Sequence, residues 1–306
     1  MVQNFSGILL KKSTIKRHRM RSANRNLHTM KQQQIILITG ASSGIGYETA
    51  RQLARQGHRV YAAARRVERM EPLRADGVTP LTLDVTDDHS RQRAVQTVIQ
   101  QEGRIDVLIN NAGYGYFGAI ENVTSEEARR QLEVNLFGLA EMTRLVLPGM
   151  RKQGHGRIIN TASIAGKLVM PFGGWYHVSK FSVEALSDAL RMETKPYGIK
   201  VVLIEPGGIR TDWGLIAADH LKASSTGTPY EKEALTEAGL LHKAYSGKYL
   251  SDPKVVTCAI LRAVNRRRPK TRYRIGRFAH TGVLLHHILP ARCWDAMMRG
   301  LLHWLR

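Results

Sequence analysis

Residues 35–46 read IILITGASSGIG, an apolar run that passes directly into a glycine-rich turn. Glycines at positions 40, 44 and 46 allow a tight backbone turn and a close approach to a bound pyrophosphate. A helix starting near Tyr47 would add free N–H groups and the positive end of its dipole. Glycines alone also occur in ordinary turns, but this position between strand and helix favours phosphate binding. The predicted contact residues are Gly40, Ser42, Gly44, Ile45 and Gly46.

The alternation of apolar runs and helical segments continues along the chain. Apolar or β-branched runs, expected as strands, occur at 35–38, 60–63, 81–83, 107–109, 157–160, 201–204 and 272–275. Helical periodicity lies between them, for example at 47–56, 89–101 and 178–193. Runs that are apolar on consecutive positions are typical of strands covered on both faces. The order predicts an α/β fold, a doubly wound Rossmann-type parallel sheet of about seven strands with helices on both faces, over residues 32–276.

Positive charge is concentrated at the two ends of the chain. The net charge is +21, but residues 1–31 hold eight Lys and Arg without an acid, and residues 262–306 hold eleven with one acid. The body between them is close to neutral, so the total charge does not indicate a nucleic-acid-binding domain. Residues 1–31 lack apolar periodicity and are predicted as a disordered basic tail. This tail is either a targeting or nucleic-acid arm or an over-extended start, because Met30 directly precedes the first strand.

The cysteine and histidine content favours a protein of the reducing cytoplasm without a structural metal. Cys258 and Cys293 form no CxxC pair. No apolar run approaches the ~18 residues of a membrane span. His280, His286 and His287 have neither HxxxH nor HExxH spacing, so we expect no metal site.

The end of the second predicted strand indicates the type of dinucleotide. An NAD site usually has an acidic residue about 20 residues after the glycines, which binds the ribose hydroxyls. Here residues 60–66 read VYAAARR, with Ala64 at the position of that acid. Arg65 and Arg66 follow with planar donors suited to a 2′-phosphate. We predict NADP(H) as the preferred cofactor, with NAD(H) as the alternative and a solvated arginine pair as the competing interpretation.

Four further motifs follow the predicted strands in order. They are NNAG at 110–113, Ser163, YHVSK at 176–180 and PGGIRT at 206–211. With the glycine turn they resemble the short-chain dehydrogenase/reductase family from about Ile35 to about Gly276. The long segment after Thr211 and the amphipathic end look most like the branch of 17β-hydroxysteroid and retinol dehydrogenases. The resemblance implies an NADP(H)-dependent oxidoreductase that interconverts a carbonyl and an alcohol on a bulky lipophilic substrate.

Carbonyl reduction requires a hydride and a proton, and the motif residues fit the proton transfer. A free tyrosine has a pKa near 10, too high for efficient proton exchange at neutral pH. Lys180 follows Tyr176 by four residues, so on a helix its charge would stabilise the phenolate. Ser163 would hydrogen-bond the substrate oxygen. The resemblance adds that Lys180 holds the nicotinamide ribose and that Asn135, in LEVNLFG, holds a water linked to the lysine.

The resemblance also implies the remaining cofactor contacts and the assembly. Asp84 would accept from the adenine amino group, and Ile209 and Thr211 would meet the nicotinamide carboxamide. The other implied contacts are Asn110, Ala112, Gly113, Pro206 and Gly207. Ser43 stands where many NADP-preferring members have a basic residue, and His177 where a small residue is common. The family usually forms dimers or tetramers. The alternative function is a catalytically silent, NADP(H)-binding regulatory protein of the same fold.

The C-terminal segment 277–306 is predicted to be amphipathic and helical. In residues 291–306 one helical face carries the apolar side chains Trp294, Met297, Met298, Leu301, Leu302 and Leu305. A second apolar patch, 283–285 with Ile288 and Leu289, precedes Pro290. The helix either packs on the protein over a lipophilic substrate pocket or subunit contact, or rests on an anionic membrane. The run RRRPKTRYR at 266–274 is interpreted as a solvated basic edge, without nucleic-acid binding.

Overall fold

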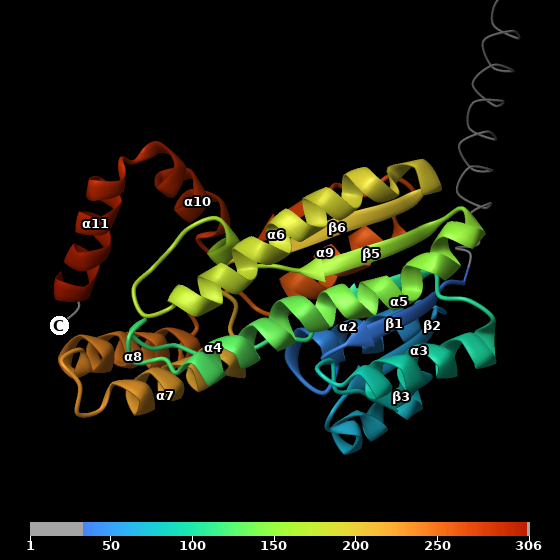
Figure 1. Cartoon of the computed structure of the whole chain (residues 1–306), viewed down its shortest axis with the longest axis horizontal. Helices are drawn as coiled ribbons and strands as arrows, with labels where there is room; N and C mark the ends of the chain where they lie inside the picture. Colours follow the sequence, from blue (N-terminus) through green and yellow to red (C-terminus); the bar gives the residue numbers. More distant parts are fainter. Residues whose placement is uncertain (1–32, 305–306) are drawn as a thin grey trace, which may run out of the picture. The chain divides into compact units, whose positions relative to one another are not determined.

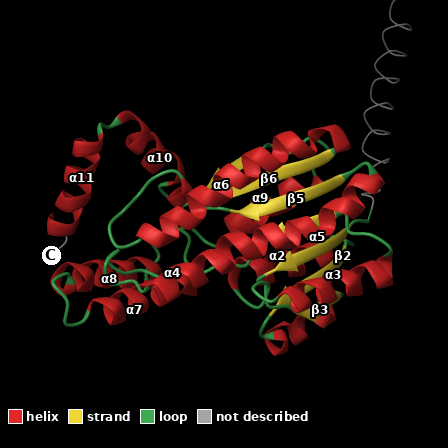
Figure 2. Cartoon of the chain, in the orientation of Figure 1, coloured by secondary structure: helices red, strands yellow, loops and turns green. Residues whose placement is uncertain are grey.

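The structure, a computed structural model, describes residues 33–304, so the predicted tail 1–31 lies outside the described residues. A parallel sheet of seven strands forms the centre (Figures 1 and 2). Its order is β3-β2-β1-β4-β5-β6-β7, and the predicted doubly wound fold is therefore confirmed. The strands are β1 (Ile35–Thr39), β2 (Arg59–Ala64), β3 (Val78–Thr82), β4 (Val107–Asn110), β5 (Gly156–Thr161), β6 (Ile199–Pro206) and β7 (Arg272–Ile275).

Alternating side chains of the strands form two cores. In β1, Ile36 and Ile38 face one core and Ile35 and Leu37 face the other, as the two-residue period of a strand requires. The first core packs against α2 (Gly44–Arg55) and α9 (Lys254–Asn265). The second packs against α3 (Asp88–Glu102), α5 (Gly138–Gln153) and α6 (Gly174–Thr194), which cover the opposite face (Figure 1). Both faces of the sheet are thus buried, which explains the continuous apolar runs.

The remaining helices are short or lie toward the C-terminus. They are η1 (Val67–Asp76), α4 (Ser125–Leu132), η2 (Glu133–Phe137), η3 (Ile164–Gly166), η4 (Lys195–Tyr197), α7 (Asp212–Ser225), α8 (Glu231–Ser246), α10 (Ala279–Ile288) and α11 (Ala291–Trp304). Helices α7 and α8 form a hairpin beyond the carboxyl end of β6 (Figure 1). Within residues 33–304, no helix has both the length and the apolarity needed to cross a membrane.

One predicted strand boundary is wrong. The strand expected at 81–83 runs instead from Val78 to Thr82 and contains Pro80. Proline has no N–H to donate to a neighbouring strand, so its presence argued against a strand at this position. Because β3 lies at the edge of the sheet, it tolerates the proline. The strand order reverses at β1, which pairs with β2 on one side and β4 on the other. Ligands of open α/β sheets bind at the carboxyl ends of strands beside such a switch point.

Candidate active site

The glycine turn fills the space between β1 and β4. Gly40 has a φ of +66°, and a Cβ on it would lie 2.6 Å from the Cα of Ala112. A Cβ on Gly46 would lie 2.5 Å from the carbonyl oxygen of Gly40. Both positions therefore require glycine, for conformation in the first case and for close packing in both. The turn brings the start of α2 to the switch point of the sheet.

Two residues that the sequence reasoning missed hold this turn in place. The Thr39 hydroxyl accepts hydrogen bonds from the N–H groups of Asn111 and Ala112, each at 3.1 Å. The Asn111 side chain donates to the Gly40 carbonyl at 3.0 Å. The N-cap residue of α2, Ser43, makes no side-chain capping bond, so its hydroxyl satisfies none of the first N–H groups of the helix. Those groups and the helix dipole form a donor set that fits a pyrophosphate.

The arginines at the end of β2 lie beside the turn. A guanidinium nitrogen of Arg66 is 3.5 Å from the Ser42 hydroxyl. Burial alone would raise the pKa of Asp84, but hydrogen bonds from Thr86 and the charges of Arg65 and Arg130 lower it overall. Asp84 is therefore an anion close to Arg65. The predicted phosphate and adenine contacts of β2 and of the loop after β3 are thus adjacent in space.

The NNAG segment divides between structural and site-facing residues. Asn110 is 2% exposed, and its side-chain amide donates to Thr143 at 3.1 Å and to Asn160 at 3.0 Å. Its side chain thus joins β4 to α5 and β5. Gly113 faces the site instead, because a Cβ on it would lie 3.1 Å from Oδ1 of Asn135.

Asn135 lies in a single π-helical turn, η2, between α4 and α5. Its Oδ1 accepts from the Tyr114 N–H at 3.0 Å, while its Nδ2 donates to the Tyr114 carbonyl at 2.8 Å and to Ser179 at 3.0 Å. Turns of this kind are rare and are frequent at functional sites. A Cβ on Gly113 would also lie 3.6 Å from Nζ of Lys180, so Asn135 and Lys180 border the same space.

Tyr176 and Lys180 stand one turn apart on α6, as predicted. The Lys180 ammonium nitrogen is 5.8 Å from the centre of the Tyr176 ring and donates to the Thr161 carbonyl at 3.0 Å. Burial lowers the pKa of Lys180 to about 8, although the charge of Glu184 opposes this. Burial raises the pKa of Tyr176, and a hydrogen bond with Ser163 opposes that change. The phenol of Tyr176 and the amine of Lys180, both buried and both able to exchange a proton, thus lie close to the Ser163 hydroxyl.

Ser163 follows β5 and is fixed from both sides. Its hydroxyl accepts from the Ala165 N–H at 3.1 Å and lies 3.4 Å from the Pro206 carbonyl, to which it donates. Beyond Pro206, the backbone of Gly207 donates to Ile275 at 2.8 Å, which ties the end of β6 to β7. The chain then passes through Ile209, which is 4% exposed, to Thr211, the N-cap residue of α7. All four proposed catalytic residues, and the PGGIRT segment, therefore meet at one edge of the sheet.

An aromatic cluster covers the Tyr176 ring. The Trp213 ring centre is 4.9 Å from that of Tyr176, and the Phe117 ring stands edge-on at 5.8 Å. Behind them the α7–α8 hairpin adds Tyr245, whose ring centre is 6.2 Å from Trp213. Buried aliphatic residues complete this cluster, namely Ala217, Ala218, Leu221, Ala234 and Ala238. The surroundings of Tyr176 are thus strongly apolar. The sequence showed a long segment after Thr211 but did not identify these side chains.

His177 anchors the loop after Ser163. Its Nδ1 lies 2.9 Å from the Ala165 carbonyl, and its Nε2 accepts from the Met170 N–H at 3.1 Å. Burial lowers its pKa, so the ring is the neutral tautomer that carries its proton on Nδ1. His177, which stands where the family often has a small residue, thus holds the backbone of the loop after Ser163, a contact that was not predicted from the sequence.

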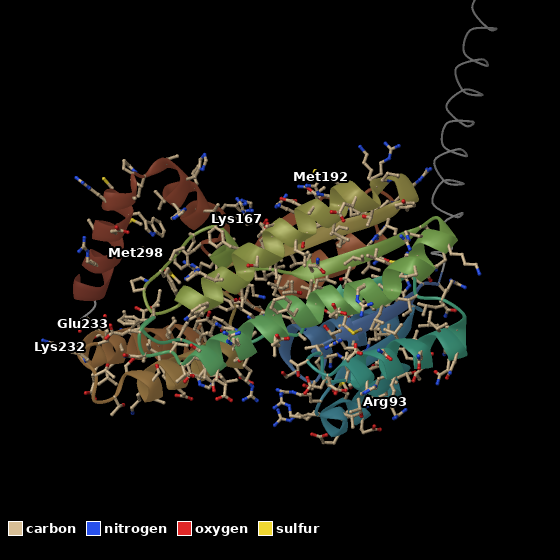
Figure 3. The ribbon with its side chains drawn as sticks, in the orientation of Figure 1. Arg93, Lys167, Met192, Lys232, Glu233 and Met298 are labelled. Carbon is tan, nitrogen blue, oxygen red and sulfur yellow. The ribbon has the colours of Figure 1, made fainter. Side chains whose placement is uncertain are left out.

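The C-terminal helices attach to the same loop. Trp294 on α11 is 7% exposed and donates its indole N–H to the Val169 carbonyl at 2.9 Å, and the His286 ring of α10 meets it edge-on. Met298, labelled in Figure 3, is half-buried on the same helix. By contrast, Leu284 and Ile288 of α10 are 59% and 61% exposed. Trp294 therefore packs on the protein, whereas Leu284 and Ile288 of α10 are open to solvent. The side chains of Leu301, Leu302 and Leu305, which belong to the same predicted face of α11, lie outside the described residues.

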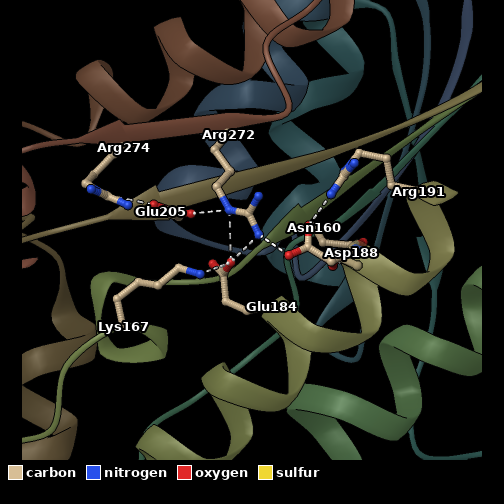
Figure 4. A network of polar contacts seen from close by, with 9 residues as sticks. Asn160, Lys167, Glu184, Asp188, Arg191, Glu205, Arg272 and Arg274 are labelled. Atoms are coloured by element: carbon tan, nitrogen blue, oxygen red, sulfur yellow. Dashed lines mark hydrogen bonds and ion pairs between the residues drawn. The ribbon is translucent and has the colours of Figure 1, made fainter. Parts of the chain in front are cut away.

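The basic run at 266–274 differs from the solvated edge that we expected. Arg272 donates to Glu184 at 3.1 Å and to Asp188 at 2.6 Å, and its Nε lies 3.0 Å from Glu205 (Figure 4). Arg274 donates to Glu205 at 2.9 Å, and Lys167 is 2.9 Å from Glu184 (Figures 3 and 4). Two of its arginines are therefore part of a partly buried ion-pair network. No local pattern in the sequence indicates this network, because Glu184 and Asp188 of α6 lie more than eighty residues before Arg272.

Comparison with known proteins identifies relatives over most of the chain. The family model described as short chain dehydrogenase matches residues 34–217. A 3-ketodihydrosphingosine reductase of Bacteroides thetaiotaomicron is 41% identical over 80% of this chain and 88% of its own length. Retinol dehydrogenase 16 of Rattus norvegicus is 35% identical over 87% of this chain and 88% of its own.

Solved structures agree with this assignment. A short-chain dehydrogenase from Streptomyces avermitilis superposes with a TM-score of 0.73 at 32% identity, covering 89% of this chain and all of its own. A serine dehydrogenase complexed with NADP+ gives 0.69 at 27% identity, over 79% and 94% of the two chains. A Burkholderia phymatum short-chain dehydrogenase/reductase in complex with NAD gives 0.71 at 26% identity, over 85% and 95%.

Proposed function

Because this chain belongs to the short-chain dehydrogenase/reductase family and is an oxidoreductase of CH–OH groups, we propose that it interconverts a carbonyl and an alcohol on a bulky lipophilic substrate. Tyr176 is the acid–base group in this proposal. The observation that supports it is the meeting of Tyr176, Ser163 and Lys180 within one buried cluster. The assay must show NADPH consumption with a lipophilic ketone or aldehyde.

The proton transfer follows from the environment of Tyr176. In the resting protein burial keeps the phenol protonated, so it can donate its proton to a nascent alkoxide. The phenolate left behind would be costly in an apolar site without compensation. The Lys180 ammonium and the Ser163 hydroxyl provide that compensation, by charge and by hydrogen bonding. In the oxidative direction the same groups accept the proton.

Asn135 is a positioning residue in this scheme. Both N–H groups of its amide are used by the Tyr114 carbonyl and Ser179, and its Oδ1 accepts one bond from the Tyr114 N–H, which fixes the space beside Lys180. A water held there would link the ammonium of Lys180 to solvent, so that the spent tyrosine is reprotonated. Asn135→Ala would lower turnover and change its pH dependence, whereas a residue with a merely structural role would change stability alone.

The residues at the switch point fit a dinucleotide. When bound, the nicotinamide ring supplies or accepts the hydride. The turn around Gly40 and Gly46 and the start of α2 would hold the pyrophosphate, and Asp84 the adenine. Arg65 and Arg66 would bind a 2′-phosphate, so NADP(H) is the preferred cofactor and NAD(H) the alternative. The remaining proposed contacts are Ser42, Gly44, Ile45, Asn110, Ala112, Gly113, Tyr176, Lys180, Pro206, Gly207, Ile209 and Thr211.

The apolar cover of Tyr176 supports the substrate class. Trp213, Phe117 and Leu221 offer aromatic and aliphatic surface and few polar atoms. Two relatives carry names that give a ketodihydrosphingosine and a retinol as substrates, and both compounds are lipids. We therefore expect kcat/KM to rise with the length of the aliphatic chain in a series of ketones.

Tyr176→Phe tests the chemistry. The variant keeps the ring but loses the proton donor, so turnover should fall by roughly two or more orders of magnitude while NADPH binding persists. Tyr197→Phe, at a side chain that is 48% exposed, is the matched control and should leave turnover unchanged. Near-native turnover of Tyr176→Phe would refute the assignment. Cofactor binding without turnover on any ketone or aldehyde of the panel would instead favour the silent regulatory alternative.

We further propose a cytoplasmic dimer or tetramer that touches anionic membranes through α10. Leu284 and Ile288 are exposed on this helix, and Arg277, also exposed, lies just before it. The free thiols of Cys258 and Cys293 fit a reducing compartment. Leu284→Gln with Ile288→Gln should abolish flotation with anionic vesicles and leave turnover of a water-soluble substrate unchanged. Unaltered flotation of this variant would contradict the membrane contact.

A further inference from the structure

A cavity of about 340 Å³ opens on the outer side of β7, between α9 and the start of α10. None of the proposed catalytic or cofactor-binding residues lines it. Five of its nine lining residues are basic, with a single acid, and these six are Arg262, Arg266, Lys270, Arg272, Arg274 and Glu205. We call this cavity the basic pocket.

The acid in the basic pocket is paired with two arginines. Glu205 is completely buried, and its carboxylate takes the guanidinium groups of Arg272 at 3.0 Å and Arg274 at 2.9 Å. Arg272 is held in addition by Glu184 and Asp188. These two arginines are therefore held by carboxylates and largely neutralised.

The other three cations lack such partners. Among the described residues, Arg262, Arg266 and Lys270 have no carboxylate within 4.0 Å. Arg262 and Arg266 are one helical turn apart at the end of α9, a spacing at which like charges repel. The Lys270 N–H donates to the buried Tyr273 hydroxyl at 3.3 Å, which fixes the loop that carries this lysine. All three side chains are exposed, so water screens their repulsion, but no carboxylate of the described part of the chain neutralises them and an anion at the cavity could pair with all three.

We propose that the basic pocket binds a phosphate group. Arg262 and Arg266 present planar forks that match phosphate oxygens, and Lys270 adds a compact charge. A carboxylate would balance one of the three free charges, whereas a phosphomonoester or a diphosphate balances two or three. The phosphate belongs either to a soluble phosphorylated compound or to a lipid headgroup. His280 of α10 also lines the pocket, and Leu284 follows it one turn later on the same helix, which connects the pocket to the exposed apolar side chains.

The basic run itself provides a matched control for a binding experiment. Arg266 lines the pocket and its neighbours Arg267 and Arg268 do not, although all three are exposed. Arg262→Gln with Arg266→Gln is therefore compared with Arg267→Gln with Arg268→Gln, which removes the same charge from the same segment. The probe is pyrophosphate, titrated by calorimetry into the full chain saturated with NADP+, so that the proposed cofactor site is already occupied. NADP+ binding is measured first. Its absence would count against the proposed function, whereas absence of pyrophosphate binding would count against the basic pocket.

The pocket pair, Arg262→Gln with Arg266→Gln, should weaken pyrophosphate binding by roughly tenfold or more, because it removes two charge-assisted contacts to the anion. The control pair, Arg267→Gln with Arg268→Gln, should change the affinity for pyrophosphate by less than about twofold. Lys270→Gln should weaken pyrophosphate binding by itself. Equal losses in both pairs would overturn the proposal, since a general positive field would then explain binding. Absence of binding by the unaltered chain to both pyrophosphate and vesicles would overturn it as well.

Vesicles distinguish the two sources of phosphate. The unaltered chain and both pairs are floated with phosphatidylcholine vesicles, with and without phosphatidic acid. Flotation that requires phosphatidic acid and is lost in the pocket pair alone assigns the phosphate to a lipid. Pyrophosphate binding without flotation assigns it to a soluble compound. Binding of a DNA duplex that both pairs weaken equally, without pyrophosphate binding, would contradict a phosphate pocket.

Discussion

Replacing Lys180 by methionine should abolish turnover and yet stabilise the folded protein. Lys180 is 5% exposed, and burial lowers its pKa from 10.5 to about 8. At about 1.4 kcal/mol for each tenfold change in acidity, the buried charge costs the folded state about 3 kcal/mol at pH 7. Methionine forfeits the hydrogen bond to the Thr161 carbonyl, worth about 1 kcal/mol. The net gain in the free energy of unfolding is then about 2 kcal/mol.

The pH dependence of this gain has a definite sign. Because the pKa of the folded state lies below that of the unfolded state, the cost is complete below about pH 8. It fades as pH rises toward 10.5, where the lysine of the unfolded chain also loses its proton. The advantage of Lys180→Met should therefore approach zero near pH ~9.5. Urea unfolding at pH ~7 and ~9.5, without cofactor, measures both values.

Lys152→Met is the matched control, because Lys152 is exposed at the end of α5. It should leave the free energy of unfolding unchanged at either pH. Two results would refute the reasoning. One is a Lys180→Met variant less stable than the unaltered chain at neutral pH; the other is a difference that does not depend on pH.

Three further predictions concern the cofactor, the loop after β5 and the α7–α8 hairpin. Arg65→Ala with Arg66→Ala should reduce the preference for NADPH over NADH by roughly tenfold or more per lost charged bond, measured by nucleotide fluorescence; equal affinities in the unaltered chain would disprove the preference. His177→Phe removes the partner of the buried Ala165 carbonyl and of the partly buried Met170 N–H, and should cost about 1–3 kcal/mol in urea unfolding, so a loss below ~0.5 kcal/mol would contradict its anchoring contact. Burial raises the pKa of Glu237 to about 7 from 4.5, so stability is lost as pH rises through this range. Glu237→Gln should therefore raise the melting temperature at pH ~8 but not at pH ~4. The control Glu193→Gln, at an exposed side chain, should change the melting temperature at neither pH. An effect of Glu237→Gln that does not depend on pH would contradict the prediction.

The fold and the order of the site residues could be predicted from the sequence because both rest on local patterns. The apolar run before Gly40 and the spacing from Tyr176 to Lys180 are visible within a few residues. The carboxyl ends of parallel strands meet at one edge, so motifs that follow successive strands come together without further information. Ser163 joined the prediction in this way, whereas Asn135, 28 residues before it, was predicted from the family resemblance.

The parts that were missed depend on pairings between distant segments. Trp213 reads as an ordinary apolar position on a helix, and only the packing of the α7–α8 hairpin brings its ring to Tyr176. Arg272 reads as one charge within a basic run, yet it bonds to Glu184, 88 residues away. Such contacts leave no periodic trace, because each involves a single side chain on each segment. The same reason explains why a basic run, expected to be solvated, proved to be partly buried.

The ion-pair network connects the proposed chemistry to the edge of the sheet. Glu205 directly precedes Pro206, whose carbonyl accepts the hydrogen bond of Ser163, and Glu184 follows Lys180 by one turn of α6. Arg272 contacts both carboxylates, so one guanidinium of β7 ties the strand that orients the serine to the helix that carries the lysine (Figure 4). Losing it would leave two buried carboxylates without their main partner, which typically costs about 3–5 kcal/mol. The residues that shape the basic pocket therefore also fix the geometry of the catalytic edge, and an anion in that pocket would share Arg272 and Arg274 with the carboxylates that hold this edge together.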